Sequence, residues 1–76
     1  MVEVNVEVER EKAIILSERK TIVHVSIIDR PWINGLIIEI GKDFFLIKDR
    51  LNGYESLVLF HELKHPIEIW KERGNG

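Results

Sequence analysis

Residues 56–66, SLVLFHELKHP, decide between two folds for this chain. The second half contains H-E-x-x-H, His61 to His65. On an α-helix both imidazoles would face one side and could hold Zn²⁺, while Glu62 polarises a bound water. The first half is a short apolar run, for which periodicity alone does not separate strand from helix. Pro66 disfavours helical geometry in the residue before it. We therefore expect an extended strand that ends in a turn.

A zinc peptidase also needs a third ligand beyond the second histidine. Only ten residues follow Pro66, none is a histidine, and Glu68 and Glu72 are the only carboxylates among them. A domain of this size also has no second lobe to form a substrate cleft. We therefore expect no enzyme, no cofactor and no metal site. His61 and His65 are retained only as candidate metal ligands, with a minimal zinc metallopeptidase as the corresponding alternative.

Five segments rich in β-branched or alternating apolar residues predict strands. They are separated by turn signals such as Arg30-Pro31 and Asn52-Gly53. Gly35 lies inside one of the segments and indicates a bend or a close approach of another backbone. The predicted strands are residues 21–29, 33–40, 44–49, 56–60 and 66–70.

The N-terminal segment, residues 1–20, is ambiguous. Valines alternate with polar residues over 2–8, as in a strand, but EVEREKAIILSERK (7–20) is rich in helix formers. We favour a helix over residues 4–18. A helix followed by five short strands predicts a mainly β domain, a strongly bent, five-stranded antiparallel β-barrel over residues 21–70. The whole chain, 1–76, is then one domain with a frayed tail at 71–76.

The composition limits the classes of function. The chain has 76 residues, 45% hydrophobic and 32% charged, with no cysteine and a net charge of −2. Disulfides and thiolate metal sites are excluded, and the negative charge argues against nonspecific coating of nucleic acid. No apolar run approaches the ~20 residues of a membrane span, and the N-terminus is too charged for a secretory signal. We expect a soluble cytoplasmic protein with no membrane partner and a thermophile-like composition.

The order and spacing of three segments resemble the Sm and Sm-like (LSm) family. WINGLIIEI (32–40) resembles the family's second strand with its internal glycine, and KDFFLIKD (42–49) resembles the end of the first Sm motif. VLFHELKHPIEI (58–69) resembles the second motif, in which a short last strand pairs with a neighbouring subunit. The resemblance implies an N-terminal helix on a curved five-stranded barrel. It also implies a homo-oligomeric ring of six or seven subunits that binds single-stranded RNA.

The resemblance also implies an RNA site, although parts of the family pattern are missing. Phe44 is similar by position to the base-stacking residue. Gly41 and Phe45 occupy the slots of the family's aspartate and asparagine, and His61-Glu62 replaces its basic pair. Among the loop residues, Lys42, Lys48 and Arg50 form a basic cluster suited to phosphate contact, or else a solvated hairpin tip. The candidate RNA-binding residues are Lys42, Phe44, Lys48 and Arg50.

The last predicted strand supports self-association independently of the family. Apolar residues on a terminal edge strand invite pairing with another copy, so Ile67, Ile69 and Trp70 are the candidate interface residues. Arg30 beside Trp32 is a second cation–aromatic pair that could present both groups to a base, or else a packed turn. The leading hypothesis is a ring-forming Sm-like protein with possible RNA binding. The alternative is a protein-interaction or scaffolding module of the same fold.

Overall fold

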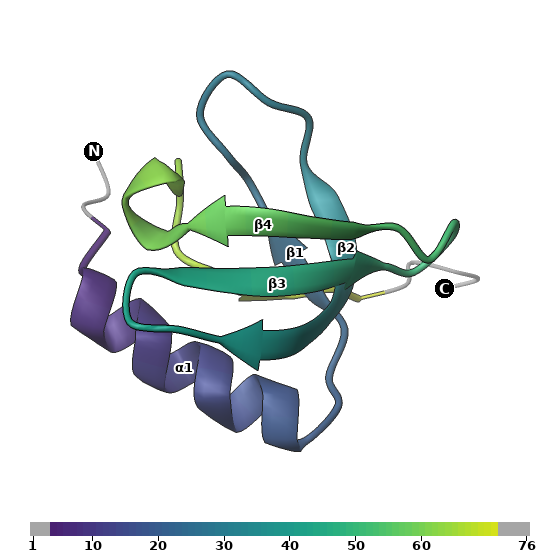
Figure 1. The fold of residues 1–76 in the computed structure, drawn as a ribbon, viewed down its shortest axis with the longest axis horizontal. Helices are drawn as coiled ribbons and strands as arrows, with labels where there is room; N and C mark the ends of the chain where they lie inside the picture. The colour runs from purple at the N-terminus through teal and green to yellow at the C-terminus, as the bar shows by residue number, and fades with distance from the viewer. Residues whose placement is uncertain (1–3, 72–76) are drawn as a thin grey trace.

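The computed structural model describes residues 4–71. One helix, α1 (Val6–Glu18), precedes a single antiparallel sheet whose strand order is β4-β3-β2-β1-β5 (Figure 1). The strands are β1 (Val23–Val25), β2 (Ile33–Ile40), β3 (Phe44–Asp49), β4 (Glu55–Leu59) and β5 (Glu68–Ile69), with a short 3₁₀ helix η1 (Phe60–Glu62) between the last two. The chain is therefore mainly β with one N-terminal helix, as the sequence predicts.

A capping side chain marks the start of α1, and a change in backbone conformation marks its end. Asn5 caps the helix, because its side-chain oxygen accepts a hydrogen bond of 3.1 Å from the Val8 backbone N–H. The helix ends before Lys20, whose φ of 53° is left-handed. Ala13 and Leu16 are buried in the core, and Ser17 Oγ donates a 2.8 Å hydrogen bond to the Ile37 carbonyl of β2. The predicted helix over residues 4–18 is thus confirmed, with its start two residues later.

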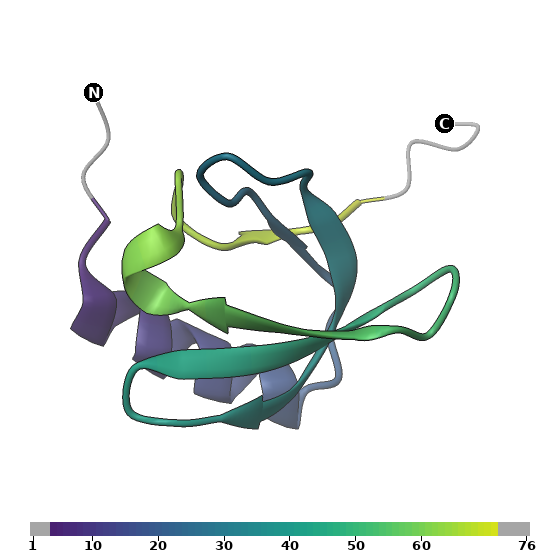
Figure 2. The ribbon, with the colours of Figure 1, turned by 45° about the horizontal axis from the view of Figure 1, so that its top comes forward.

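Two features bend the sheet. The register between β2 and β3 shifts between Ile37 and Glu39, which leaves Ile38 as a bulge. Gly35 lies so close to β3 that a Cβ atom there would be 2.0 Å from the Lys48 carbonyl oxygen. This is the close approach of another backbone that a glycine inside a strand predicts. Figure 2 shows the resulting curl and the β3–β4 hairpin projecting from it. β4 and β5 remain the two edges of the sheet, so closure into a barrel is not confirmed.

The core fills the concave side of the bent sheet and extends to α1. Phe45 of β3 and Phe60 of η1 are its largest members, and their ring centroids are 5.1 Å apart. The buried apolar residues are Ala13, Leu16, Val23, Val25, Ile27, Ile37, Phe45, Ile47, Val58, Phe60, Leu63 and Ile67.

The decisive stretch, residues 56–66, is extended and then turns. β4 ends at Leu59, η1 forms a single 3₁₀ turn, and Leu63 returns to an extended conformation. The expectation of a strand is confirmed.

Three predicted strands are shorter than expected or shifted. The first is regular only over Val23–Val25, with one further bridge between Ile27 and Leu63. The fourth starts at Glu55 and ends at Leu59, because Phe60 already belongs to η1. The fifth is reduced to Glu68–Ile69. Most of the predicted frayed tail, residues 72–76, lies outside the described residues.

Candidate interaction sites

The outer edge of β4 offers backbone groups for pairing. Asp49 N donates to the Tyr54 carbonyl (2.8 Å) and Phe60 N to the Asp43 carbonyl (2.9 Å). Hydrogen-bonded positions alternate along an antiparallel pair, so the N–H and C=O groups of Leu57 point away from β3. Its side chain is 49% exposed. Arg30 Nη1 approaches the Leu57 carbonyl at 3.4 Å, the long limit of a hydrogen bond.

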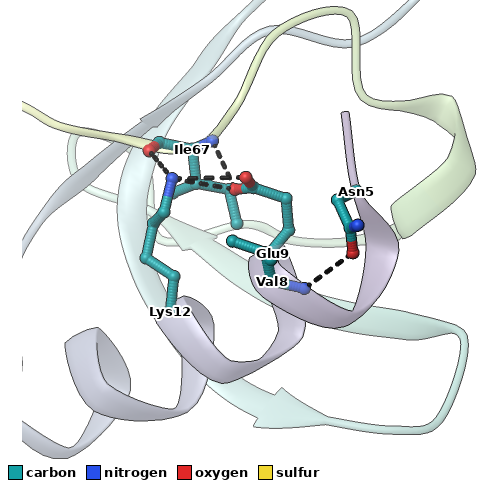
Figure 3. Close-up of polar contacts among 5 residues, drawn as sticks. All are labelled: Asn5, Val8, Glu9, Lys12 and Ile67. Carbon is teal, nitrogen blue, oxygen red and sulfur yellow. Dashed lines mark hydrogen bonds and ion pairs between the residues drawn. The ribbon is translucent and has the colours of Figure 1, made fainter. Parts of the chain in front are cut away.

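The outer edge of β5 is partly covered by α1 (Figure 3). The carboxylate of Glu9, 3% exposed, accepts a 2.8 Å hydrogen bond from Ile67 N. Lys12 Nζ donates to the Ile67 carbonyl (3.1 Å) and forms an ion pair with Glu9 (3.1 Å). The two side chains therefore bind both polar backbone groups of Ile67, as a neighbouring strand would. Glu9 and Lys12 are named the edge clamp below.

Beyond the edge clamp, β5 is open at Ile69. Trp70 N donates to the Ile22 carbonyl (2.9 Å), so by alternation the N–H and C=O groups of Ile69 point away from β1. The Ile69 side chain is 55% exposed. Of the three candidate interface residues, Ile69 is thus accessible and Trp70 is half-buried, whereas Ile67 is in the core at 3% exposure.

The four candidate RNA-binding residues lie at two ends of β3 and do not form one cluster. Lys42 and Phe44 are at its start and Lys48 and Arg50 at its end, roughly 13–26 Å apart at ~3.3 Å per strand residue. The Phe44 ring packs over its own turn, where a Cβ atom on Gly41 would meet it at 2.1 Å. The Arg50 guanidinium lies over the Trp70 ring, 4.2 Å from its centroid.

The H-E-x-x-H residues lack the helix that this motif requires. His61 and Glu62 belong to the 3₁₀ turn η1, whereas His65 follows an extended Leu63. Within residues 4–71, no group of three His, Asp or Glu side chains is arranged to hold a metal ion. The geometry therefore offers nothing that supports a zinc site at His61 and His65.

Basic side chains surround a small hollow beside an exposed tryptophan. It has a volume of about 120 Å³ and is lined by Ser26, Ile27, Arg30, Trp32, Lys64 and His65. These residues come from two separate segments, which are joined by hydrogen bonds from Lys64 N to the Ser26 carbonyl (2.8 Å) and from Ile28 N to the Glu62 carbonyl (2.9 Å). This hollow is named the Trp32 pocket.

The sequence predicts only part of the Trp32 pocket. Arg30 and Trp32 are close in sequence and form a predicted cation–aromatic pair, but Lys64 and His65 join them only through the pairing of distant segments. The edge clamp had no sequence signal either, because Glu9 and Ile67 are 58 residues apart. A glutamate in an ambiguous helix looks like any solvated side chain.

Comparisons with known proteins identify no family for the chain. No protein-family model matches it, and no curated protein sequence matches it. Among the described residues there is no helix of the length and apolarity needed to cross a membrane. The two sheet edges and the Trp32 pocket are the candidate interaction sites of the chain.

Proposed function

We propose that the chain is a Sm-like assembly module whose copies join head to tail. In this arrangement β4 of one copy pairs with β5 of the next. The observation that carries the proposal is the strand order, which leaves β4 and β5 as the two edges of one bent sheet. Edge strands present unpaired N–H and C=O groups, and another chain can satisfy them.

The side chains at the two edges support this pairing. Leu57 on β4 and Ile69 on β5 are each about half exposed, and apolar pairs across strands stabilise a sheet. The edge clamp covers Ile67 but leaves Ile69 open, so the clamp limits how far a partner strand could extend.

Joining two different edges gives a heterologous interface, which generates a ring when the rotation closes and a filament when it does not. The resemblance to the Sm-like family favours a ring of six or seven copies. Single-stranded RNA binding through Lys42, Phe44, Lys48 and Arg50 stays a prediction, and their separation along β3 does not favour a single joint site. The scaffolding alternative shares the same assembly step.

Native mass spectrometry and sedimentation of a Leu57→Pro variant test the proposal. The Leu57 N–H points away from β3 by the alternation above, so proline removes a donor from the free edge and leaves the β3–β4 ladder intact. We expect wild type to form one discrete oligomer and Leu57→Pro to remain a monomer with an unchanged circular dichroism spectrum.

The matched control is Leu51→Pro, at the tip of the β3–β4 hairpin. Leu51 is highly exposed and lies outside both edges, and its N–H donates to the Asp49 side chain at 2.8 Å. Proline there removes one hydrogen bond of the turn but no donor of an edge strand, so the oligomer should stay intact. A wild-type protein that sediments as a monomer at every concentration would contradict the proposal, as would equal loss of assembly in the two variants.

A further inference from the structure

We propose that the Trp32 pocket binds a nucleotide, with the phosphate among Arg30, Lys64 and His65 and the base stacked on Trp32. This inference concerns the Trp32 pocket and not the pairing of β4 with β5. The pocket and the β4 edge share one residue, Arg30, whose Nη1 approaches the Leu57 carbonyl at 3.4 Å. The pocket also differs from the RNA site at Lys42, Phe44, Lys48 and Arg50 that the sequence predicts.

The cationic side of the pocket suits a phosphate group. Arg30, Lys64 and His65 are all exposed, and they converge on one hollow of about 120 Å³. Phosphates are bound by such clusters through charge-assisted hydrogen bonds. Among the residues that the structure describes, no acidic side chain lines this hollow. In a chain with a net charge of −2, two cationic side chains and an imidazole around a hollow that no carboxylate lines mark a local anion site.

The aromatic side of the pocket suits a base. Trp32 is 67% exposed, which is unusual for a large aromatic residue on an isolated domain. His24 is tilted against the indole, with ring centroids 6.1 Å apart, and its Nδ1 is hydrogen-bonded to the Asn34 Oδ1 at 2.6 Å. His24 is thus held in place beside the indole, whose remaining surface is accessible. Bases stack on such exposed aromatic surfaces irrespective of their sequence.

Backbone hydrogen bonds hold the two halves of the pocket together without a ligand. The Ile27–Leu63 bridge and its flanking hydrogen bonds fix the segment with Lys64 and His65 against the segment with Arg30 and Trp32. The volume accommodates a phosphate but leaves a base outside the hollow, next to Trp32. A nucleotide meets both requirements at once, whereas inorganic phosphate meets only the first.

The test is a titration of the wild-type protein followed by ¹H–¹⁵N NMR. The indole N–H signals of Trp32 and Trp70 are assigned with a Trp70→Phe variant. The probes are uridine and adenosine monophosphate, uridine, inorganic phosphate, and a short 5′-phosphorylated oligouridine. We expect both monophosphates to shift the Trp32 indole and the Lys64 and His65 amides, while uridine and inorganic phosphate bind at least about tenfold more weakly.

Variants locate the site. Trp32→Ala and Lys64→Ala should each weaken monophosphate binding about 10-fold or more, and Trp32→Phe should restore part of the loss. The matched control is Lys71→Ala, because Lys71 is an exposed lysine that does not line the pocket and is not among the predicted RNA-binding residues. Retained amide spectra verify the fold of each variant.

Four outcomes decide the proposal. Loss of affinity in Lys64→Ala but not in Lys71→Ala supports it. Absence of any Trp32 shift, phosphate binding as tightly as the nucleotides, or equal losses in both lysine variants overturns it. The oligouridine arm distinguishes the source of the ligand, because a strand should bind much more tightly than the monophosphate only if neighbouring nucleotides also make contacts.

Discussion

Glu9 is the residue through which the N-terminal helix binds the last strand. Its carboxylate is buried and satisfies the Ile67 N–H and the Lys12 ammonium together. Glu9→Ala leaves that buried N–H without a partner, so we expect the free energy of unfolding to fall by about 1–3 kcal/mol. Glu9→Gln keeps an oxygen acceptor and should cost less. Urea denaturation measures both.

The control for this prediction is Glu11→Ala, on the exposed side of the same helix. A surface substitution of this kind should change the free energy of unfolding by no more than about 0.5 kcal/mol. If Glu9→Ala is as mild as Glu11→Ala, the edge clamp does not stabilise the fold.

Gly35 is required by a close approach of two strands. A Cβ atom at this position would be 2.0 Å from the Lys48 carbonyl oxygen and 2.7 Å from its carbon, both backbone atoms that cannot rotate away. We expect Gly35→Ala to lower the free energy of unfolding by about 3 kcal/mol, the upper part of the range for overpacking. Thermal or urea unfolding measures the loss.

Gly41→Ala is the comparison for that loss. The three atoms nearest to an added Cβ there all belong to the Phe44 ring, which can turn outward, so the cost should be smaller than at Gly35. An equal or larger loss at Gly41 would show that the backbone contact at Gly35 is not what matters.

At the scale of the element, the start of α1 depends on one cap. Asn5 satisfies the Val8 N–H at 3.1 Å, and Asn5→Ala should therefore lower the free energy of unfolding by about 1 kcal/mol. Asn5→Ser retains a capping oxygen and should recover most of the loss. Urea denaturation compares the three proteins, and an alanine variant as stable as the serine variant would contradict the role of the cap.

The strands with complete local signals were predictable, and those that depend on distant partners were not. The predicted bounds of β2 and β3 agree with the structure because alternating residues and turn signals coincide there. The fifth strand was predicted too long, because Pro66 has no N–H to donate to β1. The edge clamp on the outer side of Ile67 had no local signal either, since neither Glu9 nor Lys12 is near this strand in sequence.

The candidate sites follow the same rule. The sequence predicted that the chain is extended through Leu59, because a short apolar run is followed by a proline; this geometry removes the helix that H-E-x-x-H needs. The sequence did not predict that Lys42, Phe44, Lys48 and Arg50 lie at both ends of β3, because residues close in sequence need not form a cluster in space. The Trp32 pocket required the bridge between Ile27 and Leu63, which no local pattern predicts.

At the scale of the whole molecule, a domain of 76 residues buries a limited core, and association is one way to stabilise it. If copies join through β4 and β5, unfolding and dissociation are coupled, and the melting temperature depends on protein concentration. A tenfold increase in concentration should then raise the Tm of wild type by about 6–11 °C, since a tenfold change corresponds to about 1.4 kcal/mol and about 1 kcal/mol shifts the Tm of a domain of this size by about 4–8 °C.

The edge variant provides the decisive comparison for this last prediction. Leu57→Pro lacks a donor on the outer edge of β4, so its Tm should be lower than that of wild type and independent of concentration. Leu51→Pro loses one hydrogen bond within the turn, so its Tm should be somewhat lower than that of wild type. That Tm should still rise with concentration as in wild type, because the hairpin tip takes no part in the pairing. Differential scanning calorimetry at several concentrations measures all three proteins. A wild-type Tm that does not change with concentration would mean that the isolated sheet, with both edges open, is the stable form of the molecule.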